Sequence, residues 1–184
     1  MKFNLYVILF ITMAFLAQSC GDDEEMSTGT SELAGTWKAE SLNGDVTSTV
    51  VFGGMTTVTS SIIDGTNLNY TLVLTDDSFT TSGSYDIEAS IEVQGTNITS
   101  SDSYSNVSGN GTYFTEGNEI TVDGQFFELE LNGMPLMSET GPVTATYNIT
   151  NNVLTVTQND VDTNTQSGVT TESQVNFVST WRRQ

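Results

Sequence analysis

Histidine is absent from this 184-residue chain, and basic residues are scarce: four Lys and Arg stand against 23 Asp and Glu. Without imidazole, the chain has no Ser–His or Cys–His catalysis, no imidazole metal site and no histidine pH switch. The formal net charge of −19 argues against nucleic acid as a partner, because neutralising phosphates requires clustered Lys and Arg. The length favours a single domain that can bury a core of its own.

Long hydrophobic runs are also missing. The longest, residues 5–16, is interrupted by Tyr6 and Thr12 and is shorter than the roughly 20 residues of a membrane-spanning helix. It follows the basic Lys2 and precedes small residues, an order typical of an export signal. The only cysteine, Cys20, comes directly after Ser19. We therefore expect a signal peptide over residues 1–19.

The end of this signal resembles the lipobox of bacterial lipoproteins, in which the Cys thiol is acylated and becomes the first mature residue. The Leu usually found three residues before the cysteine is replaced by Ala17, with Leu16 one place earlier. The resemblance implies a membrane anchor at Cys20, and several acyl chains hold a protein far more firmly than one. An ordinary secretory signal with a chance cysteine is the alternative.

Four consecutive carboxylates follow the cysteine: Asp22, Asp23, Glu24 and Glu25. This run resembles the acidic surface-export signal of Bacteroidota lipoproteins, which implies an outer-membrane protein that faces the cell exterior. A solvated acidic linker is the alternative, since charge runs usually have that role. Residues 20–31 are expected to be a flexible tether.

From residue 32 to residue 184 the chain alternates between apolar and polar residues, which predicts half-buried antiparallel strands. The alternating stretches are residues 68–72, 85–93, 127–131 and 143–149. A short helical turn near Glu32 and Leu33 is the only helix expected. The fold class is therefore all-β, an up-and-down meander of about eight to ten strands.

Glycine-containing dipeptides predict the turns between these strands. The pairs of this kind are Asn43-Gly44, Asp64-Gly65, Asn110-Gly111, Asp123-Gly124 and Asn132-Gly133. Further breaks are expected at Gly53-Gly54, Asp76-Asp77, Gly117-Asn118, Gly141-Pro142 and Asn151-Asn152.

Both ends of this region carry residues that suggest how the meander closes. Gly35 and Trp37 open it as a Gly-x-Trp triplet, and a strand ending in Arg182 and Arg183 closes it. These residues resemble the lipocalin-like domains of Bacteroidota outer-membrane lipoproteins, where a basic residue of the last strand covers that Trp. The resemblance implies a closed β-barrel over residues 32–184, in which counting in phase favours Arg183 for the contact. A β-sandwich is the alternative fold.

Catalytic chemistry is not indicated. Glu128 and Glu130 fall on a face that alternation assigns to solvent, whereas glycoside hydrolysis needs two carboxylates across a cleft. The acidic stretch that starts at Asp160 lacks the Gly and Glu of an EF-hand loop, since Thr165 and Thr171 stand there. A looser surface calcium site stays open. We expect no enzyme activity and no cofactor.

Inward positions on several strands combine aromatic and aliphatic side chains. They are Tyr70, Leu72, Tyr85, Ile87, Phe127, Leu129 and Tyr147. They predict either a lumen that binds a small apolar or amphipathic ligand, or a filled core. The two corresponding functions are a lipid-anchored binding protein, and a structural or accessory surface lipoprotein with an outer-membrane protein partner.

Overall fold

The structure, a computed structural model, describes residues 30–93, 96–131, 134–135 and 141–184. Cys20 and the acidic residues Asp22, Asp23, Glu24 and Glu25 lie outside the described residues, as does the turn expected at Asn132-Gly133.

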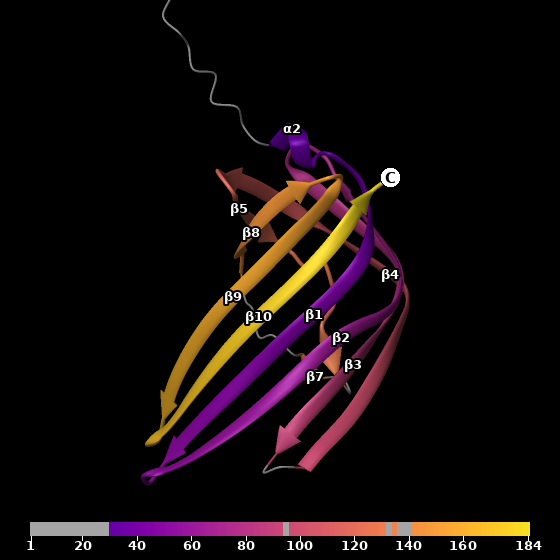
Figure 1. Ribbon diagram of the computed structural model, residues 1–184. Coiled ribbons are helices and arrows are strands. Elements are labelled where there is room, and N and C mark those ends of the chain that lie inside the picture. The colour runs from indigo at the N-terminus through magenta and orange to yellow at the C-terminus, as the bar shows by residue number, and fades with distance from the viewer. Residues whose placement is uncertain (1–29, 94–95, 132–133, 136–140) are drawn as a thin grey trace, which may run out of the picture.

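Eight antiparallel strands form one meander that closes into a ring (Figure 1), which confirms the all-β fold class. Around the ring the order is β1, β10, β9, β8, β5, β4, β3 and β2, and β2 pairs again with β1. The bounds are β1 Gly35–Phe52, β2 Met55–Leu74, β3 Ser78–Val93, β4 Thr96–Glu116, β5 Glu119–Asp123, β8 Val143–Thr150, β9 Val153–Gln166 and β10 Val169–Arg183. Because the described strands of this meander belong to one closed sheet, the sandwich alternative is wrong.

Three small elements complete the described chain. The helical turn expected near Glu32 is present as α2, Thr30–Leu33. β6, Glu130–Leu131, and β7, Met134–Pro135, pair only with each other among the described strands.

The ring closes unevenly. β5 and β8 share only four register pairs, from Glu119–Thr146 to Val122–Val143. β1 and β10 instead pair along almost their whole length, from Trp37–Arg183 to Phe52–Val169. The long hairpins β1–β2, β3–β4 and β9–β10 therefore extend beyond the short β5 and β8, at the end of the molecule opposite α2 (Figure 1).

Several of the expected turns are correct. Gly53 and Gly54, at φ 57° and 81°, connect β1 and β2, and Asn151 and Asn152, at φ 54° and 63°, connect β8 and β9. Both pairs occupy the left-handed region that tight hairpin turns require.

The turns expected at Asn43-Gly44, Asp64-Gly65 and Asn110-Gly111 are wrong, because all three pairs lie within the strands β1, β2 and β4. Their glycines are needed for close approach. A Cβ on Gly44 would lie 2.2 Å from the Phe177 ring, and one on Gly111 would lie 2.2 Å from a backbone oxygen of Asp123. Local sequence cannot distinguish a glycine that turns the chain from one that makes room for a neighbour.

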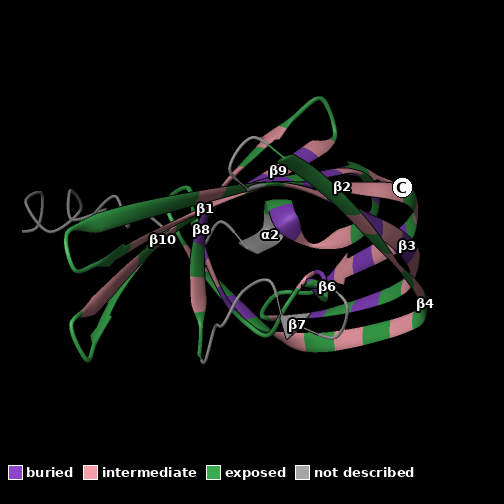
Figure 2. Cartoon of the chain, turned by 90° about the horizontal axis from the view of Figure 1, so that it is seen from below, coloured by how far each residue is buried: buried purple, intermediate pink, exposed green. Residues whose placement is uncertain are grey.

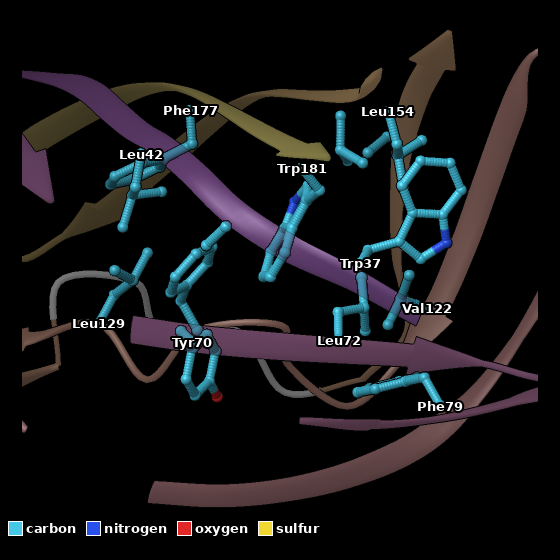
Figure 3. Close-up of a cluster of buried hydrophobic side chains, with 14 of the residues drawn as sticks. Trp37, Leu42, Tyr70, Leu72, Phe79, Val122, Leu129, Leu154, Phe177 and Trp181 are labelled. Atoms are coloured by element: carbon cyan, nitrogen blue, oxygen red, sulfur yellow. The ribbon is translucent and has the colours of Figure 1, made fainter. Parts of the chain in front are cut away.

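Inward side chains of the ring form a continuous core (Figure 3). Its largest fully buried side chains are Trp37, Trp181, Tyr70, Tyr85 and Phe79. Figure 2 shows buried residues around the ring, while the outer ends of the long hairpins are mostly exposed.

The strand expected over residues 127–131 is wrong. Only Glu130 and Leu131 are in a strand, the short β6, and that strand is not part of the ring. Phe127 and Leu129 are nevertheless buried, with 6% and 8% of their surface exposed. The alternation therefore predicts which side chains point into the ring. It does not predict whether the backbone pairs with a neighbouring strand.

Candidate binding pocket inside the ring

An aromatic cluster fills the middle of the ring. The Tyr70 ring lies edge-on to Tyr85 at 4.9 Å between centroids and stacks on Phe127 at 5.2 Å. Phe127 in turn lies 4.9 Å from Trp181. Such contacts add stability beyond the area that they bury, so this part of the interior is packed and well defined.

Two tyrosine hydroxyls hold the segment that carries Phe127. The Tyr85 hydroxyl donates to the Glu128 carbonyl at 2.8 Å and accepts from the Glu128 N–H at 2.9 Å. The Tyr104 hydroxyl does the same to Glu130, at 2.6 Å and 3.1 Å. Side chains of β3 and β4 thus satisfy backbone groups that a ladder would satisfy in a strand.

Burial changes the acid–base behaviour of the tyrosines. It raises the pKa of Tyr70 and Tyr85 above the ordinary value, since a phenolate would lose its hydration there. It also raises the pKa of Tyr113 to about 12, with the Asp76 and Asp77 carboxylates adding to the effect. These hydroxyls are therefore neutral at physiological pH and serve as hydrogen-bonding groups.

A pocket lies beside the cluster, between residues 125–131, which we call the inner segment, and the strands β1, β5, β8, β9 and β10. Its volume is about 80 Å³, it is partly open to solvent, and apolar side chains make up most of its wall. The lining residues are Leu42, Val122, Gly124, Gln125, Phe126, Phe127, Leu129, Val143, Ala145, Val156, Gln158, Phe177 and Ser179. Figure 3 shows Leu42, Phe177 and Leu129 gathered on one side of Tyr70 and Trp181.

The sequence identified only part of this lining. Of the seven candidate residues, Phe127 and Leu129 line the pocket. Four others, Tyr70, Leu72, Tyr85 and Ile87, are buried in the core without lining it. Tyr147 is half-buried, and its hydroxyl donates to the Gly117 carbonyl at 3.2 Å.

Sequence analysis missed Phe177 and Leu42 among the lining residues. They lie on β10 and β1, the last and first strands of the ring, which pair with each other. The alternation of Phe177 with Val175 could have placed it inward. No pattern in the sequence indicates that the space beside Phe177 stays open.

The ring is closed by an arginine over a tryptophan at the α2 end. Of the two candidate arginines, Arg183 lies over the Trp37 ring, with its guanidinium carbon 4.2 Å from the ring centroid. Arg183 also donates to the Ala34 carbonyl at 2.9 Å and to the Glu32 carbonyl, while Trp37 Nε1 donates to the Leu33 carbonyl at 2.8 Å. A Cβ on Gly35 would lie 2.8 Å from the Arg183 guanidinium, so this position keeps space for the arginine.

Polar clusters are less developed. The acidic stretch around Asp160 is part of the strand β9 and not a calcium loop. In the part of the chain that the structure describes, no group of three or more carboxylate or cysteine side chains is placed to hold a metal ion. No helix among those residues is long and apolar enough to cross a membrane.

Comparison of the chain with protein-family models, with curated proteins and with solved structures finds no match.

Proposed function

We propose that this protein is a lipid-anchored, non-catalytic binding protein that holds a small apolar group inside its β-ring. The observation that carries the proposal is the solvent-accessible apolar pocket beside Phe127, built by the inner segment and the strands β1, β5, β8, β9 and β10. A wall drawn from elements far apart in sequence is typical of a binding site, as is the small number of polar groups in it.

The size of the pocket restricts the ligand. Its volume of about 80 Å³ is well below the roughly 300–1,000 Å³ of sites that enclose a whole drug-sized molecule. It accommodates one ring or the end of a chain, and the rest of a larger amphipathic molecule would leave through the open side. Gln125, Gln158 and the Ser179 hydroxyl at the lining could orient a polar end.

The proposal is tested by titrating the protein with an environment-sensitive apolar dye. We expect saturable binding by the parent and a loss of binding in Leu129→Trp, because the indole would fill the pocket. Leu68→Trp is the matched control, since Leu68 of β2 is half-buried against the core but does not line the pocket. Circular dichroism establishes that both variants keep the fold. Equal binding by all three proteins, or none by the folded parent, would refute the proposal.

A second candidate function is a structural or accessory surface protein with a filled interior and a protein partner. The packed aromatic cluster of Tyr70, Tyr85, Phe127 and Trp181 favours it, because little of the lumen is left free. A folded parent that binds no apolar dye would leave this function as the better one.

The membrane location is part of the proposal and rests on Cys20 and the acidic residues behind it. The lipocalin-like relationship is likewise proposed, and the contact between Trp37 and Arg183 supports it. We propose an outer-membrane protein that faces the cell exterior. Replacing Asp22, Asp23, Glu24 and Glu25 by Asn and Ala should reduce cleavage by protease added to intact cells. Unchanged cleavage would make the acidic run a plain linker.

A further inference from the structure

The hairpin of β1 and β2 ends in a segment without charge. Residues 46–63 contain no Asp, Glu, Lys or Arg, although the chain as a whole carries 23 acidic residues. Val46 and Ile63, at the two ends of this segment, still pack in the core, and the turn between them extends past the ring at the end opposite α2 (Figure 1). In a protein of net charge −19, an exposed segment without charge but with apolar side chains indicates a surface that contacts something other than water.

Apolar side chains are exposed around the turn of this hairpin. Phe52 is 56% exposed and Met55 69%, and Val51 and Val58 are 38% and 53% exposed. Phe52 and Met55 are direct partners across the hairpin, and Phe52 also pairs with Val169 at the start of β10. We call Val51, Phe52, Met55 and Val58 the apolar tip.

The space around the turn of the apolar tip is open, although Val51 and Phe52 remain paired with Thr170 and Val169 of β10. A Cβ built on Gly53 or Gly54 would meet nothing within 4 Å, and the same is true of Gly168 in the adjacent β9–β10 turn. Within the part of the chain that the structure describes, Phe52 and Met55 are therefore left largely exposed, and their burial would be favourable.

We propose that the apolar tip inserts into the interfacial region of a lipid membrane with neutral headgroups. Apolar anchors enter about 5–10 Å into the boundary between headgroups and acyl chains. With a rise of about 3.3 Å per strand residue, that depth takes in two or three residues on either side of the turn. Those residues include Val51, Phe52 and Met55, while Thr56 and Thr57 would reach the headgroups and hydrogen-bond there.

Area and charge favour lipid over a protein partner or a second copy. A stable protein interface buries about 800 Å² on each side, whereas four side chains on a two-stranded turn offer much less. Basic residues are absent from the tip, and the net charge of the chain repels anionic lipid, so neutral headgroups fit best. The proposal does not depend on acylation of Cys20.

Tryptophan fluorescence tests the insertion directly. The native Trp37 and Trp181 are both fully buried, so a tryptophan placed at the tip is the one that lipid can reach. The full chain carrying Cys20→Ala and Phe52→Trp is mixed with phosphatidylcholine vesicles that contain brominated acyl chains. Phe114→Trp in the same background is the matched control, because Phe114 is 61% exposed on β4 and lies next to the turn at the opposite end.

We expect brominated lipid to quench Phe52→Trp at least twofold more than Phe114→Trp, with weaker quenching in vesicles of phosphatidylglycerol. Adding Met55→Thr should weaken the quenching at position 52 further, since it removes the most exposed apolar side chain of the tip. Equal quenching at both positions, or none at position 52, would overturn the proposal. A blue shift of Phe52→Trp that grows with protein concentration in the absence of lipid would also overturn it, and would identify a second copy as the occupant.

Discussion

Removing one hydroxyl from the interior tests whether side chains replace a ladder for the inner segment. Tyr85→Phe deletes both hydrogen bonds to Glu128 but keeps the ring, and with it the contacts to Tyr70 at 4.9 Å and to Phe127 at 5.3 Å. Each hydrogen bond contributes about 0.5–1.5 kcal/mol net, and a shielded backbone group left unpaired costs more. Because Tyr85 itself is 1% exposed, we expect a loss of about 2 kcal/mol.

Tyr104→Phe is the matched variant. It removes the same pair of contacts from Glu130, but at a site open to solvent, where water can replace the hydroxyl. Its cost should be below about 1 kcal/mol.

Urea unfolding measures the free energy of unfolding of both variants. In thermal unfolding, a chain of this size should lose about 2–4 °C in Tm for each kcal/mol of stability lost. Amide exchange at Glu128 should accelerate in Tyr85→Phe alone. Equal losses for the two variants, or a loss below about 0.5 kcal/mol for Tyr85→Phe, would refute this account of the segment.

Three further predictions concern the closure, the tyrosines and the anchor. Arg183→Met should lower the free energy of unfolding by about 2 kcal/mol, because a cation over Trp37 and two hydrogen bonds are lost. Arg182→Gln, which breaks an exposed ion pair with Glu40, should lower it by less than about 1 kcal/mol. Equal losses for the two variants in denaturant unfolding would contradict the role of Arg183 in closing the ring. Burial raises the pKa of Tyr70, Tyr85 and Tyr113, so the folded state holds these protons more tightly than the unfolded state. The contribution of these tyrosines to the free energy of unfolding should therefore be fully present below pH 10 and decrease as the pH rises toward 12. Tyrosinate absorbance and the circular dichroism of the fold should change together. Tyrosinate that forms near pH 10 while the protein stays folded would refute this prediction. Cys20→Ala, combined with Phe52→Thr and Met55→Thr to remove the apolar tip as a second membrane contact, should move the protein from the membrane fraction to the soluble fraction of cells, whereas the Phe52→Thr and Met55→Thr variant that keeps Cys20 should stay in the membrane fraction. Equal membrane fractions for these two variants would end the lipoprotein hypothesis.

The fold could be predicted from the sequence wherever alternation coincided with a ladder. Residues 85–93 and 143–149 alternate and lie in β3 and β8, because one face of each strand is buried and the other is wet. Residues 127–131 alternate just as regularly, but only Glu130 and Leu131 pair with another strand, and the Tyr85 hydroxyl bonds the backbone of Glu128 in place of a ladder. The pattern depends on side-chain burial alone, so it cannot tell these cases apart.

The pocket was harder to predict than the fold for a related reason. Whether inward residues meet or leave a gap depends on small differences in packing between distant segments, such as Leu42 on β1 and Leu129 on the inner segment. Alternation placed Tyr70, Leu72, Tyr85 and Ile87 inside, and it could not show that these four fill space while Phe127 and Leu129 border a gap.

The pairing of β1 with β10 means that the ring cannot close before β10 is available. Trp37 pairs with Arg183, and the N–H of Gln184 donates to the Thr36 carbonyl at 2.9 Å. Contacts between residues so far apart in sequence give a high contact order, which slows folding. A growing polypeptide cannot complete this pairing until residues 169–183 have been synthesised and have left the ribosome. Until then, β1 and any partner that has already formed expose an unpaired edge to proteases and to other chains.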